Sequence, residues 1–115
     1  MIRIIEPIEI EYYVDDRGGC PFLSWSNSLE NKATRAMVLQ RLVKVAAGNL
    51  GDCKRLVQTS GIWELRIHEG PGYRIYFGRV GKKVILLLCG GTKKTQAADI
   101  ARANKYWRHY QEIKQ

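Results

Sequence analysis

Cysteine is scarce in this sequence, and the few cysteines form no recognisable pattern. Cys20, Cys53 and Cys89 are odd in number and make no CxxC pair or cysteine–histidine spacing, which argues against a disulfide framework or a zinc site. We therefore expect neither a metal nor another cofactor. Cys89 ends an apolar run and is expected to be a small buried residue.

Long hydrophobic runs are also absent. The longest apolar run is far too short to span a membrane, and the N-terminal residues lack the apolar core of a signal peptide. No internal repeat or low-complexity tract is present. We therefore expect a cytoplasmic protein without a membrane partner. With 115 residues, the chain is expected to form a single domain, 1–115, with a core of its own.

Acidic residues are few in the second half of the chain. Residues 1–61 carry 8 basic and 7 acidic side chains, whereas residues 62–115 carry 11 basic and 4 acidic ones. The net charge of +8 therefore resides almost entirely in the second half. Such a positive field favours a polyanionic partner, for example nucleic acid, and the alternative is a basic surface that serves only solubility.

Residues 62–94, in this basic half, predict three consecutive strands. Apolar and polar residues alternate from Trp63 to His68, and the same alternation returns from Tyr73 to Phe77 after the turn residues Glu69 to Gly72. Val84 to Leu88 is an unbroken apolar run, which is typical of a central strand buried on both faces.

The loop between the first two of these strands decides which way two arginines face. Directly opposed residues of an antiparallel pair share a face, so Arg66 and Arg74 lie on one side only if paired residue numbers have an even sum. This condition requires a loop of three or five residues, or a bulge. We predict such an odd loop, with Arg66, Arg74 and Tyr76 on one exposed face.

The remaining segments predict one more strand and three helices. Residues 1–16 are strand-like, residues 20–29 and 31–47 form a helical hairpin on one face of the sheet, and residues 52–61 are a crossing loop. A last helix follows residue 95. The order β-α-α-β-β-β-α predicts an α+β fold with a small, mainly antiparallel sheet. The apolar stripe expected on the second helix is Leu39, Leu42, Val43 and Ala46.

Several of these segments together resemble the RelE/ParE superfamily of toxins, most closely its HigB-like "addiction module killer" branch. The resemblance covers roughly residues 20 to 110. It is carried by the segments Phe22 to Trp25, Ala47 to Gly51, Trp63 to Ile67, Gly70 to Phe77 and Leu86 to Gln96. It implies a small sheet flanked by a helical hairpin, the toxin role in a type II toxin–antitoxin module, and a cognate antitoxin, often a helix-turn-helix protein.

The resemblance also implies an activity, since the ribonuclease members of the superfamily cut mRNA, usually on the ribosome, without a metal. In such cleavage the ribose 2′-OH attacks the adjacent phosphate. The enzyme must remove the proton of that hydroxyl, neutralise charge on the phosphate oxygens and protonate the leaving 5′ oxygen. We therefore expect a metal-independent endoribonuclease, or mRNA interferase, that inhibits translation and arrests growth.

Five residues are the candidates for catalysis. Arg74 matches the family's strand arginine and is the expected phosphate clamp, Arg66 is expected beside it, and Lys94 falls where the family places a basic residue. His68 is chemically suited to proton transfer near neutral pH. Glu64 is either a base in its own right or a partner of Arg66. The tyrosine that some members carry near the site has no counterpart around Ile100, so the general base is unassigned.

Further basic and aromatic residues are candidates for RNA contacts. The exposed face expected for Tyr76 would let a base stack on its ring. The other candidates for RNA binding are Lys93, Lys54 and Arg55.

Two other functions are compatible with the sequence. ParE-like members poison DNA gyrase through protein contacts and generally lack the basic catalytic cluster, whereas Arg66, Arg74 and the Lys93–Lys94 pair favour a nuclease. A plain RNA-binding module would bind RNA without cleaving it. Because all phosphate-binding proteins show salt-dependent affinity, binding alone does not separate this module from the nuclease.

Overall fold

The computed structural model describes residues 7–114, which fold into an α+β structure, as predicted. The strands are β1 (Glu9–Tyr12), β2 (Cys53–Arg55), β3 (Trp63–Ile67), β4 (Tyr73–Val80) and β5 (Val84–Thr92). The helices are α1 (Pro21–Ser28), α2 (Lys32–Ala46) and α3 (Gln96–Ile113), the last preceded by a 3-10 turn at Lys93–Thr95. The strand predicted in residues 1–16 is confirmed as β1, although residues 1–6 lie outside the described residues.

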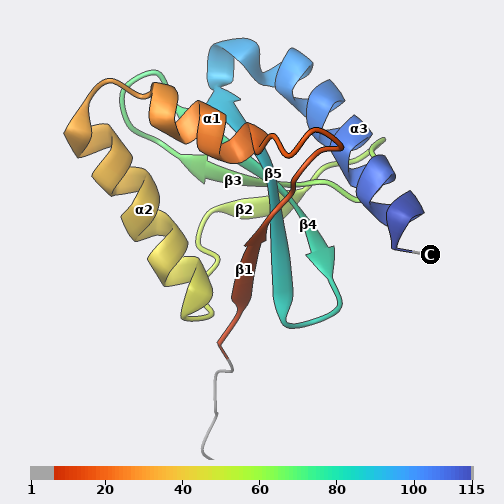
Figure 1. Ribbon diagram of the computed structural model, residues 1–115. Helices are drawn as coiled ribbons and strands as arrows, with labels where there is room; N and C mark the ends of the chain where they lie inside the picture. The colour runs from red at the N-terminus through yellow and green to blue at the C-terminus, as the bar shows by residue number, and fades with distance from the viewer. Residues whose placement is uncertain (1–6, 115) are drawn as a thin grey trace, which may run out of the picture.

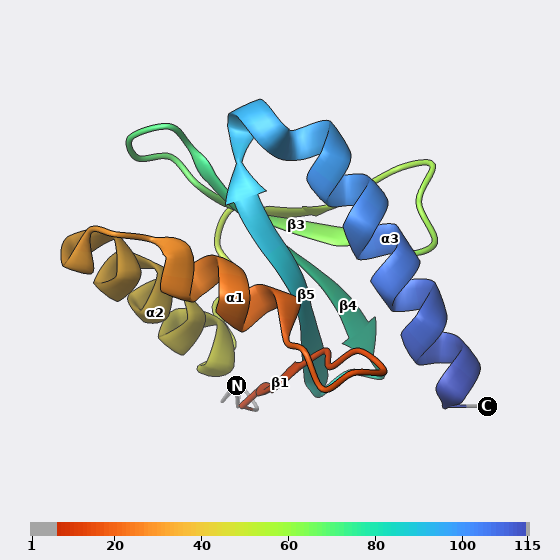
Figure 2. The same ribbon diagram turned by 45° about the horizontal axis from the view of Figure 1, so that its top comes forward.

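The five strands form one mixed sheet in the order β1-β5-β4-β3-β2. β1 runs parallel to β5, and every other neighbouring pair is antiparallel. The helices α1 and α2 lie on one side of this sheet and α3 lies on the other (Figure 1). Turning the molecule brings α3 forward and shows the sheet between the two helical layers (Figure 2).

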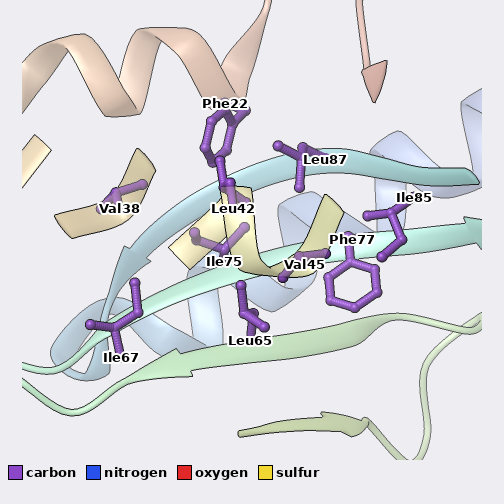
Figure 3. Packing of buried hydrophobic residues seen from close by; sticks show 10 residues of the cluster. All are labelled: Phe22, Val38, Leu42, Val45, Leu65, Ile67, Ile75, Phe77, Ile85 and Leu87. Atoms are coloured by element: carbon purple, nitrogen blue, oxygen red, sulfur yellow. The ribbon is translucent and has the colours of Figure 1, made fainter. Parts of the chain in front are cut away.

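The helical hairpin covers one face of the sheet, as predicted. α1 begins at Pro21, which is tolerated in a first helical turn because its missing N–H would have no helical partner there. α2 begins after Asn31, whose side-chain oxygen accepts hydrogen bonds from the backbone N–H groups of Ala33 (2.8 Å) and Thr34 (3.3 Å). Figure 3 shows the core beneath, formed by Phe22, Val38, Leu42, Val45, Leu65, Ile67, Ile75, Phe77, Ile85 and Leu87.

The apolar stripe predicted for α2 is wrong in phase. Leu42 is buried as expected, but it is joined in the core by Val38 and Val45, whereas Leu39 and Val43 are 63% and 61% exposed. The helix carries apolar residues on two sides, and both sets have helical spacing. The sheet buries only one of them, and the sequence pattern alone could not tell which.

The predicted crossing loop, residues 52–61, contains a strand that the sequence analysis missed. β2 pairs along the free edge of β3 with Cys53 opposite Leu65 and Arg55 opposite Trp63. It has only three residues, two of them charged and exposed, so neither apolar alternation nor β-branched residues signal it. Short charged edge strands of this kind limit edge-to-edge association.

The last helix covers the opposite face of the sheet and buries a second apolar cluster. Trp107 of α3 packs over Gly78 of β4, where a Cβ would overlap the indole ring. Its Nε1 donates a hydrogen bond of 2.9 Å to the carbonyl oxygen of Ser60. Cys89 is buried in this cluster, as predicted. No helix within residues 7–114 is long and apolar enough to span a membrane.

Candidate active site

A depression of about 580 Å³ lies where the β3–β4 hairpin meets the start of α3. Strands β3 and β4 contribute Arg66 and Arg74, the hairpin loop contributes residues 70–72, and the turn before α3 contributes Lys93. His68 and Gln96 complete its wall. Three of the predicted catalytic residues, Arg66, His68 and Arg74, therefore line one pocket.

The strand register brings the two arginines together. Arg66 pairs with Arg74 and Ile67 pairs with Tyr73, which leaves a five-residue loop, so the predicted odd loop is confirmed. The carbonyl oxygen of Gly72 accepts a 2.7 Å hydrogen bond from the backbone N–H of Lys93, which ties the hairpin loop to the turn before α3. Gly72 has φ +74°, a conformation that favours glycine.

Glu64 lies beneath the arginines and is fully buried. Its Oε1 accepts a hydrogen bond of 2.8 Å from Nε of Arg66, and its Oε2 accepts one of 2.6 Å from Nε2 of Gln96. Nε of Arg74 lies 4.0 Å from the same Oε1. The carboxylate therefore links both arginine-bearing strands to the first residue of α3.

The ionisation state of Glu64 follows from two opposing effects. Burial is the largest single effect and raises the pKa of this carboxyl group, but the hydrogen bonds from Arg66 and Gln96, the Tyr76 hydroxyl and the positive charge of Arg66 together lower it by more. The pKa of Glu64 is therefore held below its usual value, and the group is a carboxylate at neutral pH. A charged acceptor in this position orients the guanidinium groups above it.

Arg74 lines the pocket but is only 6% exposed, so its predicted position on an exposed face is wrong. Its Nη1 donates a 3.3 Å hydrogen bond to the carbonyl oxygen of Tyr73. Its Nε is buried on the side of Glu64 and has no hydrogen-bond partner among residues 7–114. A largely desolvated guanidinium at the pocket wall favours an anion there, for example a phosphate group.

His68 forms a hydrogen bond with the carboxylate of Asp52 at the rim of the pocket. Its Nε2 faces Oδ2 of Asp52, and a hydrogen bond from His68 is the largest factor that lowers the pKa of that carboxyl group. The carbonyl oxygen of Asp52 accepts a 2.9 Å hydrogen bond from the backbone N–H of Arg66. Asp52 was missed by the sequence analysis because its position depends on the pairing of β2 with β3.

The predicted exposed position of Tyr76 is wrong. Tyr76 shares the face of Arg74 but is fully buried in the second apolar cluster beneath α3. Burial, together with the nearby Glu64 carboxylate, raises the pKa of the Tyr76 phenol, which therefore stays neutral. No pattern of residues indicated that the last helix would lie across this part of the sheet. The ring of Tyr76 is thus no stacking platform for RNA.

Of the other predicted residues, Lys93 lines the pocket. Lys94 is the next residue on the same exposed turn but is not part of the lining. Lys54 pairs with Glu64 across the sheet edge and so lies on the face of the site, whereas Arg55 pairs with Trp63 and lies on the opposite face. Within residues 7–114, no group of three or more His, Cys, Asp and Glu side chains is placed to hold a metal.

Comparison with known proteins gives matches of three kinds. The family described as "Phage derived protein Gp49-like (DUF891)" matches residues 24–108. A protein of Haemophilus influenzae, described as uncharacterized, is 43% identical over 82 residues, which cover 71% of this chain and 81% of that protein.

A structural match was found with the toxin RelE of Escherichia coli, in a free-state structure of a double arginine mutant. The TM-score is 0.60 at 16% identity, over 85% of this chain and 94% of RelE. At this level of identity the match concerns the fold. The predicted RelE-like arrangement of sheet and helices is confirmed.

Proposed function

The chain belongs to the Gp49-like family and has the RelE fold, and from this premise we propose that it is the toxin of a type II toxin–antitoxin module and acts as a metal-independent endoribonuclease. The observation that carries the proposal is the convergence of Arg66, Arg74 and Lys93 in one pocket. Three cations around a single depression suit a phosphodiester, and they have no evident use in a gyrase poison that acts through protein contacts.

The proposed reaction cleaves RNA by attack of a 2′-OH on the adjacent phosphorus. The bond from the 2′ oxygen to phosphorus forms and the bond to the 5′ oxygen breaks, which leaves a 2′,3′-cyclic phosphate and a free 5′-OH. Arg74 and Arg66 stabilise the charge on the phosphate oxygens, and Lys93 with the adjacent Lys94 holds the strand. The ribose proton leaves to a base, and an acid returns a proton to the 5′ oxygen.

His68 is the proposed proton carrier of the site. Because Asp52 engages Nε2, Nδ1 is the ring atom left to exchange protons with the RNA. The carboxylate also stabilises the imidazolium that forms when His68 accepts the ribose proton. Glu64 has a positioning role in this scheme, since it is buried beneath the arginines and already bonded to Arg66 and Gln96.

The proposed substrate is mRNA on the ribosome, and the proposed partner is a cognate antitoxin, a helix-turn-helix protein encoded by the neighbouring gene. Both follow from the family and from the RelE fold rather than from residues of the pocket. The net charge of +8 supports an RNA substrate, because electrostatic attraction raises the rate and strength of association with polyanions.

The test is expression of wild-type protein and of Arg74→Ala in bacterial cells, with mapping of new mRNA 5′ ends. Wild type should arrest growth and create 5′-OH ends within coding regions, and Arg74→Ala should lower cleavage at least about 100-fold, as loss of a transition-state donor does in other enzymes. Arg79→Ala is the matched control, because Arg79 lies on the same strand but stacks on Trp63 outside the pocket.

Two outcomes would contradict the nuclease. Growth arrest without new mRNA ends would favour poisoning of gyrase, and DNA breaks would then be measured. If purified protein bound RNA but did not cleave it, either in the presence or in the absence of ribosomes, the protein would be an RNA-binding module rather than a nuclease. Equal loss of activity in Arg74→Ala and Arg79→Ala would contradict the proposed role of Arg74 in the site.

A further inference from the structure

Gln96 carries the one side-chain amide in the pocket lining of residues 7–114. The other polar side chains of that lining are those of Arg66, Arg74, Lys93 and His68, and the proposed reaction uses all four. Three of them are cations, which donate hydrogen bonds and accept none. The reaction gives Gln96 no contact with the RNA, so the purpose of an amide in this wall needs its own explanation.

The amide of Gln96 is held in one orientation. Its Nε2 donates a 2.6 Å hydrogen bond to Oε2 of Glu64, which is fully buried. Because a carboxylate only accepts hydrogen bonds, the NH₂ group of the amide and not its oxygen faces Glu64. The oxygen Oε1 is turned away from Glu64 and makes no hydrogen bond to another residue of 7–114. Gln96 is half-buried and lines the pocket, so Oε1 is an oriented acceptor there.

The sugar–phosphate backbone of RNA contains one kind of donor for such an acceptor. Phosphate oxygens and the ether oxygens of ribose only accept hydrogen bonds, and the three cations of the pocket suit them. The 2′-OH is the backbone group that donates a hydrogen bond, and it is also the group that distinguishes RNA from DNA. The bases carry donors as well, but these differ between nucleotides, whereas a 2′-OH accompanies every phosphate that the cations bind.

The hydroxyl that suits Gln96 is not the one that attacks phosphorus. In the proposed reaction the attacking 2′-OH gives its proton to His68, and an acceptor that retained this proton would oppose the attack. A neutral amide does not take up a proton near neutral pH, so Gln96 is not the base. The hydroxyl bound by Oε1 therefore belongs to a nucleotide adjacent to the cleaved one.

We propose that Gln96 binds the 2′-OH of a nucleotide adjacent to the cleaved one and so makes the pocket selective for RNA over DNA. The proposal rests on the proposed function for the presence of a nucleic-acid strand in the pocket, and it adds the group that selects ribose. Glu64 acts on this selection through Gln96, because its carboxylate fixes the direction of Oε1.

The experiment measures, by fluorescence anisotropy, the affinity of purified protein for short RNA strands that carry the mapped cleavage sequence. The first strand lacks only the 2′-OH of the cleaved nucleotide, so it is not cut. Two further strands also lack the 2′-OH of the nucleotide on the 5′ side or on the 3′ side. Wild type should bind one of these two strands about 3- to 10-fold more weakly than the first, which is the effect of one hydrogen bond.

Two variants separate the acceptor from the contact with Glu64. Gln96→Met has a side chain of similar length without the acceptor, and it should abolish the difference between the strands. Gln96→Lys keeps a donor toward Glu64 but also lacks the acceptor, so it should abolish the difference even though its charge strengthens binding of every strand.

The matched control is Gln111→Met, which replaces an exposed glutamine near the other end of α3 and should keep the wild-type difference. Thermal unfolding of each variant establishes that it is folded.

Three results would overturn the proposal. In the first, Gln96→Met lowers the affinity for all strands alike and keeps the wild-type difference, which is the effect of a structural role through Glu64. In the second, Gln96→Lys keeps the difference that Gln96→Met abolishes. In the third, the variants respond to a change of the neighbouring base and not to removal of its 2′-OH, which would assign Oε1 to a base.

Failure of the nuclease is distinguishable from failure of this proposal. If the protein binds RNA without cutting it, unmodified RNA and the same sequence in deoxyribose, with uracil retained, replace the three strands. Wild type should then prefer RNA, and Gln96→Met should reduce this preference about 3- to 10-fold. A wild-type protein that binds neither strand would overturn both proposals.

Discussion

At the scale of single residues, Glu64 makes stability depend on pH in a definite direction. Its pKa in the folded protein is below that of a free glutamate, because its hydrogen bonds and the positive charge of Arg66 together outweigh the effect of burial. The unfolded chain therefore takes up a proton more readily than the folded one at acidic pH. The stabilisation is complete above the unfolded pKa of about 4.3 and is lost as pH falls through the folded pKa.

Replacement of Glu64 by glutamine should therefore destabilise the protein at neutral pH and have less effect in acid. We expect Glu64→Gln to lower the free energy of unfolding by about 1–3 kcal/mol near neutral pH, because Arg66 loses its charged acceptor and Arg74 loses a nearby negative charge. The difference from wild type should shrink as pH falls below about 4. Urea unfolding of both proteins across this pH range measures the difference in the free energy of unfolding.

The control for this series is Glu112→Gln, which removes an exposed carboxylate from the end of α3. Its effect should be small at every pH, since exposed charges contribute little to stability. A Glu64→Gln destabilisation that stays constant from neutral pH down to about pH 3 would contradict the assigned ionisation.

For single residues, some positions could be predicted from the sequence and others could not. The shared face of Arg66 and Arg74 could be predicted, because the parity of residue numbers across a hairpin is a property of the chain alone. The burial of Tyr76 could not, because it depends on the packing of α3 against that face. The same limit applies to Leu39 and Val43, which have helical spacing as good as that of the buried residues of α2.

At the scale of elements, the missed strand β2 distinguishes two neighbouring cations. Lys54 and Arg55 are consecutive, so their side chains lie on opposite faces of the sheet. Lys54 is opposite Glu64 and shares the face of the pocket, whereas Arg55 is opposite Trp63 on the other face. Both residues were predicted to bind RNA because they fall in a predicted loop, where no face is defined.

We predict that Lys54→Ala weakens RNA binding about 3- to 10-fold, by the loss of one phosphate contact, and that Arg55→Ala changes it by less than about 2-fold. The two substitutions remove equal charge from adjacent positions, so each controls for the other. Fluorescence anisotropy with an RNA methylated at its 2′ oxygens measures affinity without cleavage. Equal losses for the two variants would show that the strand face does not matter and that only overall charge does.

The pair of Asp52 and His68 is also a property of the elements rather than of the sequence. The two residues are far apart in the chain, and they meet because β2 adds to the edge of β3 just beyond Asp52. The order of helices and strands was predictable from hydrophobic periodicity and turn residues. A three-residue edge strand lies below the length at which such periodicity exists, so the residue that it positions was not predictable either.

At the scale of the whole molecule, the excess of positive charge was visible in the sequence, and the fold concentrates part of it. Arg66, Arg74 and Lys93, all from the second half of the chain, line one pocket, and Glu64 is the acidic residue bonded among them. The composition alone gives the sign of the electrostatic field around the protein. Its convergence on one depression requires the hairpin register and the turn before α3.

This convergence predicts the salt dependence of RNA binding. If Arg66, Arg74 and Lys93 each neutralise a phosphate, these three residues should contribute about −2 to the slope of log affinity against log salt concentration, since each contact on single-stranded nucleic acid contributes about −0.7. Lys93→Ala should reduce the steepness of this slope by about 0.7, the share of one contact. Lys82→Ala removes an equal charge at the far turn of the β4–β5 hairpin and should leave the slope unchanged.

The titrations use the 2′-methylated RNA between about 50 and 200 mM salt, the range in which counterion release dominates binding. If Lys93→Ala and Lys82→Ala reduced the slope equally, the RNA would be responding to the net charge of +8 rather than to the pocket.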